Sequence, residues 1–428
     1  MKSSHYSFKP LNIGRIVIWS LFALALAIAP LLFQSSLALT MLSQIGYLII
    51  ICLSYNILLG QGGMLSFGHA VYTGLGSFIA IHAMNMAGQP IPLVLIPLVG
   101  GVAGLGFAVL LGFVTTKKSG TTFAMITLGI GELVASMALM FPEFFGGEGG
   151  ITTNRVYGKP FLGMTFGSQM EVYYLIAVYC FACTVAMFAF TGTPLGRILN
   201  AVRDNPERVE FIGYNTQRVR YFAFIIAGFF AGIGGGLATI NFEIVTGADS
   251  LNVVRSGGYL LFTFLGGATF FFGPIIGAVL LVIASVLLSE LTKAWLLYLG
   301  LVFLFMVMYA PGGIASLIMM NLRLAKFGRL KPLIASYLGL AGTGLVAILG
   351  AAAMVEMIYH LQLNAALGPT MTFMGIQLNA TALNSWFGSA FVMLTGLGLF
   401  EVVRRHYIHQ WGEIQEAVEK DIKRAEAL

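Results

Sequence analysis

The sequence contains few residues that could perform covalent chemistry. No G-x-x-x-x-G-K-[ST] motif occurs, so the chain lacks the loop that cradles nucleotide phosphates in P-loop ATPases. No group of His, Cys and Asp residues has the spacing of a metal site, and no nucleophile has a base at a recognisable position. Cys180 and Cys183 have C-x-x-C spacing but stand in an apolar run with no other Cys or His nearby. We therefore expect a protein that is not an enzyme and holds no cofactor or metal.

Polar residues instead interrupt two apolar segments that are rich in glycine. The first, LLGQGGMLSFGHAVYTGLGSFIAIHA, runs from Leu58 to Ala83, and the second runs from Gly247 to Leu281. Irregular backbone at membrane depth is tolerated only where protein buries it or water lines it, and paired broken segments mark the pathway of a transporter. An alternative role for the glycines is close helix packing, which GFFAGIGGG from Gly228 to Gly236 also indicates. The predicted pathway residues are Gln61, Ser66, Gly68, His69, Glu132, Arg255 and Ser256.

Glu132 joins this set because it is the one carboxylate near a predicted mid-membrane position, in the stretch TLGIGELVASM. Ionisable side chains at that depth are rare and usually functional, so Glu132 is a candidate functional residue. Glu132 could bind a coupling proton or ion. Alternatively, it could be a buried structural acceptor for hydroxyl groups such as that of Thr127.

The composition requires a membrane protein. Hydrophobic residues make up 58% of the chain and charged residues 9%, against about 25% charged residues in soluble domains. We predict an all-α polytopic protein with about ten core transmembrane helices, some broken or partial, and a C-terminal two-helix extension. The predicted spans are Ile13–Phe33, Leu42–Leu59, Leu65–Met86, Ile91–Val114, Phe123–Phe141, Val172–Phe190, Tyr221–Ile240, Val253–Phe272, Ile275–Leu291, Ala294–Tyr309, Leu333–Met357 and Trp386–Val403.

The basic residues indicate the orientation of these spans. With the N-terminus inside, all but four of the 23 Lys and Arg residues fall in the cytoplasm. The four outside are Arg155, Lys159, Arg255 and Lys293. Because basic residues concentrate in cytoplasmic loops, we expect both termini in the cytoplasm.

The charged link PLGRILNAVRDNPERVEFIGYNTQRVR, from Pro194 to Arg220, has the signals of a short helix. Asn205 can cap it, Pro206 suits the first helical position, and Gly213 suits the position after its end. Glu207 favours the first turn because it complements the helix dipole. We predict a helix of about two turns at the inner membrane face; the alternative is a solvated loop that merely follows the charge rule.

The tail after Val403 predicts an amphipathic cytoplasmic helix. Its apolar positions recur at helical spacing: Ile408, Trp411, Ile414, Val418, Ile422 and Ala425. We expect the first four of these side chains to pack on a partner such as an ATPase. The predicted organisation is a permease core at 1–320 with a coupling loop at 194–220, a basic link and extra hairpin at 321–404, and the tail at 405–428.

Several of these motifs resemble those of the permease subunits of branched-chain amino-acid ABC importers, the LivM type. The family element G-Q-L-S-L-G-H-A resembles Gly63 to Ala70, and T-L-x-x-G-E resembles Thr127 to Glu132. The cytoplasmic G-R-x-x-x-A-[IV]-R-[ED]-N resembles Gly196 to Asn205. FFGGEGGIT, LGGATFFFGPIIGA and MYAPGGI resemble further family elements, and together the motifs cover about Leu42 to Ile318.

This resemblance implies a bacterial inner-membrane complex. Its other members would be a second permease, two cytoplasmic ATPases that dock on the short helix of each permease, and an external substrate-binding protein. The residues implied in ATPase coupling are Arg197, Arg203, Asp204, Asn205, Pro206, Glu207 and Gly213. The chain departs from the family pattern at two places: Arg208 and Val209 replace the usual paired alanines, and Arg255 stands where small or apolar residues are usual.

We therefore predict the membrane-spanning permease subunit of an ATP-driven importer for hydrophobic or branched-chain amino acids or a similar small solute. One alternative is an ion-coupled secondary transporter that uses Glu132. Another is a membrane assembly protein that uses the extra C-terminal helices. The capped helix of the charged link favours the importer, because ATP-driven uptake needs a docking element and ion coupling does not.

Overall fold

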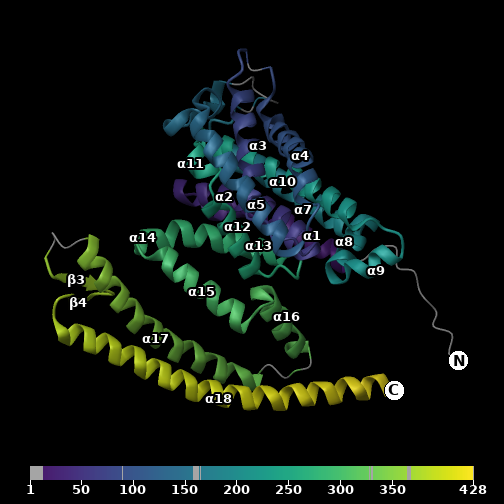
Figure 1. Cartoon of the computed structure of the whole chain (residues 1–428). Helices are drawn as coiled ribbons and strands as arrows, with labels where there is room; N and C mark the ends of the chain where they lie inside the picture. The colour runs from purple at the N-terminus through teal and green to yellow at the C-terminus, as the bar shows by residue number, and fades with distance from the viewer. Residues whose placement is uncertain are drawn as a thin grey trace. The chain divides into compact units, whose positions relative to one another are not determined.

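The computed structural model describes residues 13–88, 90–157, 163, 165–326, 328, 331–363 and 368–427 (Figure 1). Lys159, which was predicted to lie outside, and the side chains of Val418, Ile422 and Ala425 are outside this description. The chain forms two compact units. The first is Met1–Ile283 with Pro311–Ala315, and the second is Ala284–Ala310 with Ser316–Leu428.

The described residues are almost entirely helical. The first helices are α1 (Ile13–Leu32), α2 (Ser36–Asn56), α3 (His69–Met84), α4 (Ile96–Thr115), α5 (Gly120–Met140), α6 (Pro142–Phe145), α7 (Gln169–Gly192), α8 (Pro194–Asp204), α9 (Pro206–Phe211) and α10 (Thr216–Phe242). They are followed by α11 (Gly247–Ser250), α12 (Val253–Gly266), α13 (Gly273–Val282), α14 (Ser289–Leu291), α15 (Trp295–Tyr309), α16 (Gly313–Lys326), α17 (Lys331–Leu363) and α18 (Leu383–Ala427). The strands are β1 (Ile151–Thr152), β2 (Ile244–Val245), β3 (Thr370–Phe373) and β4 (Ile376–Asn379).

The all-α membrane fold is confirmed. Across the described ranges, nine helices are long and apolar enough to cross a membrane, or ten if α15 and α16, bent by 49°, form one span. The two predicted spans with glycine-rich sequence are shorter than expected: α3 begins at His69 and has 16 residues, and α12 ends at Gly266 and has 14. The residue after α12, Gly267, has a φ of +116°, which only glycine adopts readily, and this conformation ends the helix.

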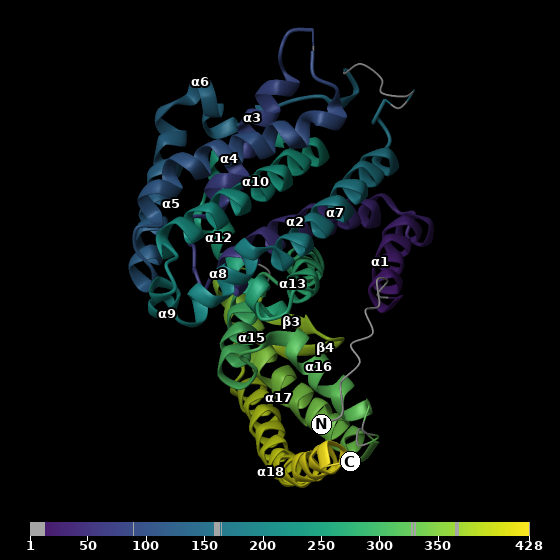
Figure 2. The ribbon, with the colours of Figure 1, turned by 90° about the vertical axis from the view of Figure 1, so that its right-hand side faces the viewer.

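The backbones of α3, α4 and α10 approach one another closely in the first unit (Figures 1 and 2). A Cβ atom at Gly232 of α10 would lie 2.2 Å from the carbonyl oxygen of Gly100 in α4. A Cβ atom at Gly235 would lie 2.0 Å from the carbonyl oxygen of Thr73 in α3. Only glycine fits at such distances, and close backbone contact through small residues is how membrane helices associate. The packing role predicted for Gly228 to Gly236 is therefore confirmed.

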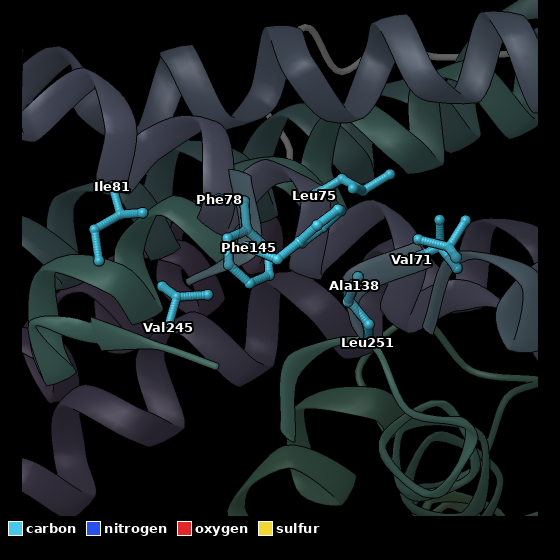
Figure 3. Close-up of a cluster of buried hydrophobic side chains, with 9 residues drawn as sticks. Val71, Leu75, Phe78, Ile81, Ala138, Phe145, Val245 and Leu251 are labelled. Atoms are coloured by element: carbon cyan, nitrogen blue, oxygen red, sulfur yellow. The ribbon is translucent and has the colours of Figure 1, made fainter. Parts of the chain in front are cut away.

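A cluster of buried apolar side chains packs α3 against α5, α6 and β2 (Figure 3). Its members are Val71, Leu75, Phe78, Ile81, Val134, Ala138, Phe145, Val245 and Leu251. The rings of Phe78 in α3 and Phe145 in α6 meet edge to face with centroids 4.9 Å apart. Because Val245 lies in β2, which follows α10 in the chain, the cluster also packs β2 against α3.

The loop after α6 is tied to the same end of the unit. β1 pairs antiparallel with β2, with Ile151 opposite Val245. The backbone N–H of Arg155 donates to the Glu243 carboxylate at 2.8 Å, and its guanidinium donates to the Ile240 carbonyl at 3.3 Å. The loop and the following segment therefore cover the region where α10 ends and β2 begins.

In the second unit, α17 and α18 form an antiparallel hairpin whose connection contains β3 and β4 (Figure 1). The predicted tail helix is the final part of α18, a single helix of 45 residues. Ile414 packs with Leu324 and Leu333, and Trp411 packs against the same cluster. The expectation that Ile414 packs on a partner protein was therefore wrong, because its own chain buries it; Trp411 is half-buried and Ile408 is exposed.

Candidate functional site

The first glycine-rich segment is irregular between a π-helical turn at Ile57–Gln61 and the start of α3. Side chains satisfy its backbone groups. The Tyr55 hydroxyl donates to the Ser66 carbonyl at 2.7 Å, and the Phe67 N–H donates to the Thr127 hydroxyl at 3.1 Å. This protein environment is what makes irregular backbone tolerable inside a membrane.

The two glycine-rich segments meet at this break. The Ala70 N–H, in the first turn of α3, donates to the hydroxyl of Ser256 in α12 at 2.9 Å. A Cβ atom at Gly68 would lie 2.4 Å from the Thr127 carbonyl oxygen, so the loop also lies directly on α5. The structure thus brings Ala70 and Ser256 together although they are 186 positions apart in the sequence.

His69 is completely buried in this region. The Ser54 hydroxyl donates its proton to the Ile51 carbonyl at 2.7 Å, and its oxygen lies 2.9 Å from His69 Nε2. Because Ser54 has only one proton, Nε2 must carry the ring proton and donate it. Nδ1 and the buried hydroxyl of Ser66 have no hydrogen-bond partner within the described part of the chain.

Glu132 is not part of this cluster. It is exposed on α5, whereas Thr127 and Gly131 occupy the buried face of that helix. The interpretation of Glu132 as a buried acceptor for Thr127 was wrong, because the Thr127 hydroxyl donates to the Ala124 carbonyl at 2.8 Å.

Arg255 lines a separate cavity of about 220 Å³. Its Nη1 donates to both carboxylate oxygens of Asp249, at 2.9 and 2.8 Å, and its Nε lies 3.3 Å from the Tyr259 hydroxyl. The rest of the wall comes from α2, α3, α10 and β2. The sequence interpretation missed Asp249 and Tyr259. The signal that could have indicated them was their spacing, because Asp249 lies six residues before Arg255 and Tyr259 lies four residues after it.

The charged link contains two helices rather than one. The predicted helix is α9, and the Asn205 side chain caps it by accepting from the Arg208 N–H at 2.9 Å. Gly213 has a φ of +93°, as its predicted position requires. The preceding residues form α8, because Pro194 begins that helix and the Thr193 hydroxyl accepts from the Gly196 N–H. The solvated-loop alternative was therefore wrong.

The helix α8 contacts the irregular segment directly. The Asn200 amide donates to the Gln61 side chain at 2.8 Å, and an Arg203 guanidinium N–H donates to the Gly60 carbonyl. The structure therefore places Gln61 against the charged link and away from the Arg255 cavity. Of the other coupling candidates, Asp204 pairs with Arg203 at 2.9 Å, while Arg197, Pro206 and Glu207 are exposed.

The end of α9 exposes large apolar side chains. Phe211 is 90% exposed and Ile212 is 67% exposed, although both lie in a charged link. In contrast, Val209 of the same helix is buried.

A protein-family model described as the permease component of a branched-chain amino acid transport system matches residues 37–311. The chain belongs to this permease family. The LivM permease protein of the high-affinity branched-chain amino acid transport system of Salmonella typhimurium is 28% identical over 305 residues, covering 66% of this chain and 71% of that protein. The LivM protein of Escherichia coli is 27% identical over 298 residues, covering 64% and 69% of the two chains.

A guanosine ABC transporter permease protein of Bacillus subtilis, NupQ, is 32% identical over 78 residues, covering 18% of this chain and 24% of that protein. No solved structure matches the permease. The family match spans both glycine-rich segments and the charged link, and it ends before α16. This chain is therefore a multi-pass ABC importer permease whose second unit extends mostly beyond the matched region.

Proposed function

We propose that this permease works in a bacterial inner membrane with a second permease, two cytoplasmic ATPases and an external binding protein. The transported solute is a hydrophobic or branched-chain amino acid or a similar small molecule. The relatives named for branched-chain amino acid transport support this substrate class. The observation that carries the proposal is the exposure of Phe211 and Ile212 at the end of a capped cytoplasmic helix.

These two side chains form the proposed ATPase-docking surface. Exposed apolar residues gathered at one place in a charged segment are typical of protein interaction sites. A Phe side chain that becomes buried at an interface contributes about 1.5–3 kcal/mol before ordering costs. The α9 helix is therefore suited to insert into a groove of an ATPase subunit.

The contacts of α8 provide a route from that surface to the membrane interior. Asn200 and Arg203 hold Gln61 and Gly60, and the segment after them leads to Ser66 and His69. Movement of α8 would therefore displace one end of the irregular segment. In this proposal Arg197, Asp204, Asn205, Pro206, Glu207 and Gly213 shape or flank the docking helix, while Ser66, Gly68, His69, Arg255 and Ser256 belong to the pathway region.

The exposed face of α5 is suited to the second permease. Met125, Gly129, Glu132 and Ser136 are all exposed, and their spacing places them along one stripe of the helix. A carboxylate at the helix centre costs about 2.5–3.5 kcal/mol when it faces lipid, so such groups face protein or water. We therefore assign Glu132 to the permease–permease contact rather than to ion coupling.

The orientation and domain assignments complete the proposal. Both termini lie in the cytoplasm, the core comprises residues 1–320, and residues 321–404 and 405–428 form the extra hairpin and the tail. The concentration of basic residues in the links predicted to be internal supports this orientation. ATP hydrolysis takes place on the partner chains.

The test replaces Phe211 and Ile212 with Ala in the complete complex. We expect normal amounts of the chain in the membrane, at least tenfold slower uptake of labelled L-leucine, and loss of substrate-stimulated ATP hydrolysis. Phe387→Ala is the matched control, because Phe387 is also an exposed aromatic residue but lies in α18, outside the charged link. Normal stimulated hydrolysis in the double variant would overturn the proposed docking role.

A further inference from the structure

The cavity beside Arg255 carries one charge of each sign on its wall. The Arg255 side chain is 30% exposed, whereas that of its partner Asp249 is 67% exposed. An ion pair this accessible contributes only about 0–1 kcal/mol to stability. The pair can therefore open at little cost when charged groups of a solute replace its two partners.

Hydroxyl groups on α3 and α10 supply acceptors on the same wall. The Ser77 hydroxyl donates to the Gly235 carbonyl at 2.9 Å, and the Thr239 hydroxyl donates to the same carbonyl at 3.1 Å. Because a hydroxyl has a single proton, both oxygens are left with accepting capacity only. Acceptors of this kind suit the N–H groups of an ammonium ion, which the Asp249 carboxylate also attracts.

The rest of the wall is apolar and the space is small. Ile51, Ala238, Phe242 and Val245 contribute apolar side chains. The volume of about 220 Å³ lies below the range of roughly 300–1,000 Å³ that is typical of sites for drug-sized ligands. The cavity therefore suits a solute with few heavy atoms and a short aliphatic group.

We propose that this cavity is a binding site for a small zwitterion, an α-amino acid with an apolar side chain. The carboxylate of the solute takes the place of Asp249 on the Arg255 guanidinium, whose fork of donors matches a carboxylate. Its ammonium group binds Asp249 and the hydroxyl oxygens of Ser77 and Thr239. This assignment rests on the proposed importer function and adds the residues that select the solute by charge.

A neutral sugar or nucleoside gains nothing from this arrangement. To reach the wall it would have to separate Arg255 from Asp249, and it offers no charged group to either partner. A zwitterion gains charge-assisted hydrogen bonds to both partners that a neutral solute cannot form, so the pair favours the zwitterion. Arg255 and Asp249 thus act together as a charge filter.

The test uses the full-length chain in lipid nanodiscs with Ser250→Cys as a reporter, because Ser250 lines the cavity. The three native cysteines are buried, so the parent chain serves as the blank for thiol labelling. We expect L-leucine to slow thiol labelling of the Ser250→Cys variant at least tenfold more than any of four other probes at equal concentration. These probes are leucinamide, 4-methylpentanoate, D-ribose and guanosine. Arg255→Gln and Asp249→Asn should each abolish that protection, while the control Val254→Gln, at an exposed neighbour outside the cavity, should retain it.

Equal protection by leucine and its singly charged or neutral analogues would overturn the proposal, and so would protection that survives Arg255→Gln. Absence of protection by every probe would also overturn it. These results are independent of the ATPase-docking test at Phe211 and Ile212. Failure of the charge filter with intact docking leaves an importer with a different solute, whereas failure of docking alone removes only the proposed ATPase-docking surface.

Discussion

Replacing two glycines of α4 by alanine should have opposite effects on stability. A Cβ atom at Gly104 would lie 2.3 Å from the Gly228 carbonyl oxygen of α10, and the next nearest atoms also belong to the backbone of α10. At Gly106, only two residues away in the same helix, a Cβ atom would meet nothing within 4 Å. The two positions therefore form a matched pair that differs in packing but not in helix.

The magnitude follows from two contributions. Both alanine variants gain about 0.5–1 kcal/mol, because Gly in a helix interior is that much less favourable than Ala. Gly104→Ala also carries an overpacking cost of about 1–3 kcal/mol, since backbone atoms cannot rotate out of the way. The helix gain cancels in the comparison, so Gly104→Ala should be less stable than Gly106→Ala by about 1–3 kcal/mol.

The assay is thermal unfolding of the two purified full-length variants in the same detergent. At about 1–2 °C per kcal/mol for a unit of this size, the midpoint for Gly104→Ala should be roughly 1–6 °C below that for Gly106→Ala. The parent chain should lie slightly below Gly106→Ala. Equal midpoints, or a lower midpoint for Gly106→Ala, would refute the argument that backbone contact between α4 and α10 holds the first unit together.

Three further changes test other parts of the structure. Gly60→Ala should lower the amount of permease in the membrane, because its Cβ would lie 2.1 Å from the Ala268 carbonyl oxygen; an immunoblot showing the parent level would contradict this. Glu356→Leu should destabilise the second unit by about 1–3 kcal/mol in thermal unfolding, because the hydroxyls of Thr292 and Tyr298 lose their shared acceptor, whereas Glu290→Leu at an exposed position should not. A cysteine replacing the exposed Met374 should react with an impermeant reagent in intact cells, and one replacing Glu413 only after permeabilisation; the reverse result would overturn the proposed orientation.

The sequence predicted the membrane fold because lipid restricts a spanning backbone to few structures. Long apolar runs with few charges can only be helices or barrel strands, and their length selects helices. Helix signals that act within a few residues were also sufficient for α9, since Asn205, Pro206 and Gly213 occupy the positions that their chemistry favours. The lengths of α3 and α12 were not predicted, because hydropathy continues through Leu65 and Phe272 although the backbone there is no longer helical.

The candidate site was harder to predict because its parts meet only through the fold. Gln61 stands in the same glycine-rich stretch as Ser66, yet the structure binds it to Asn200 of α8. The sequence indicated that Glu132 lies at membrane depth. It did not indicate whether Glu132 is buried or exposed, because that depends on which side of α5 packs against the other helices. The Arg255–Asp249 pair forms because the short α11 helix positions Asp249, and no apolar periodicity in the sequence predicts that helix.

The source of energy for uptake tests the central claim most directly. The complete complex, with the binding protein present, is reconstituted in vesicles, and uptake of labelled L-leucine is measured under two conditions. In the first, ATP is supplied to the ATPase side together with an uncoupler; in the second, a proton gradient is imposed without ATP. The importer assignment predicts uptake in the first condition and none in the second, whereas uptake driven by the gradient without ATP would contradict it.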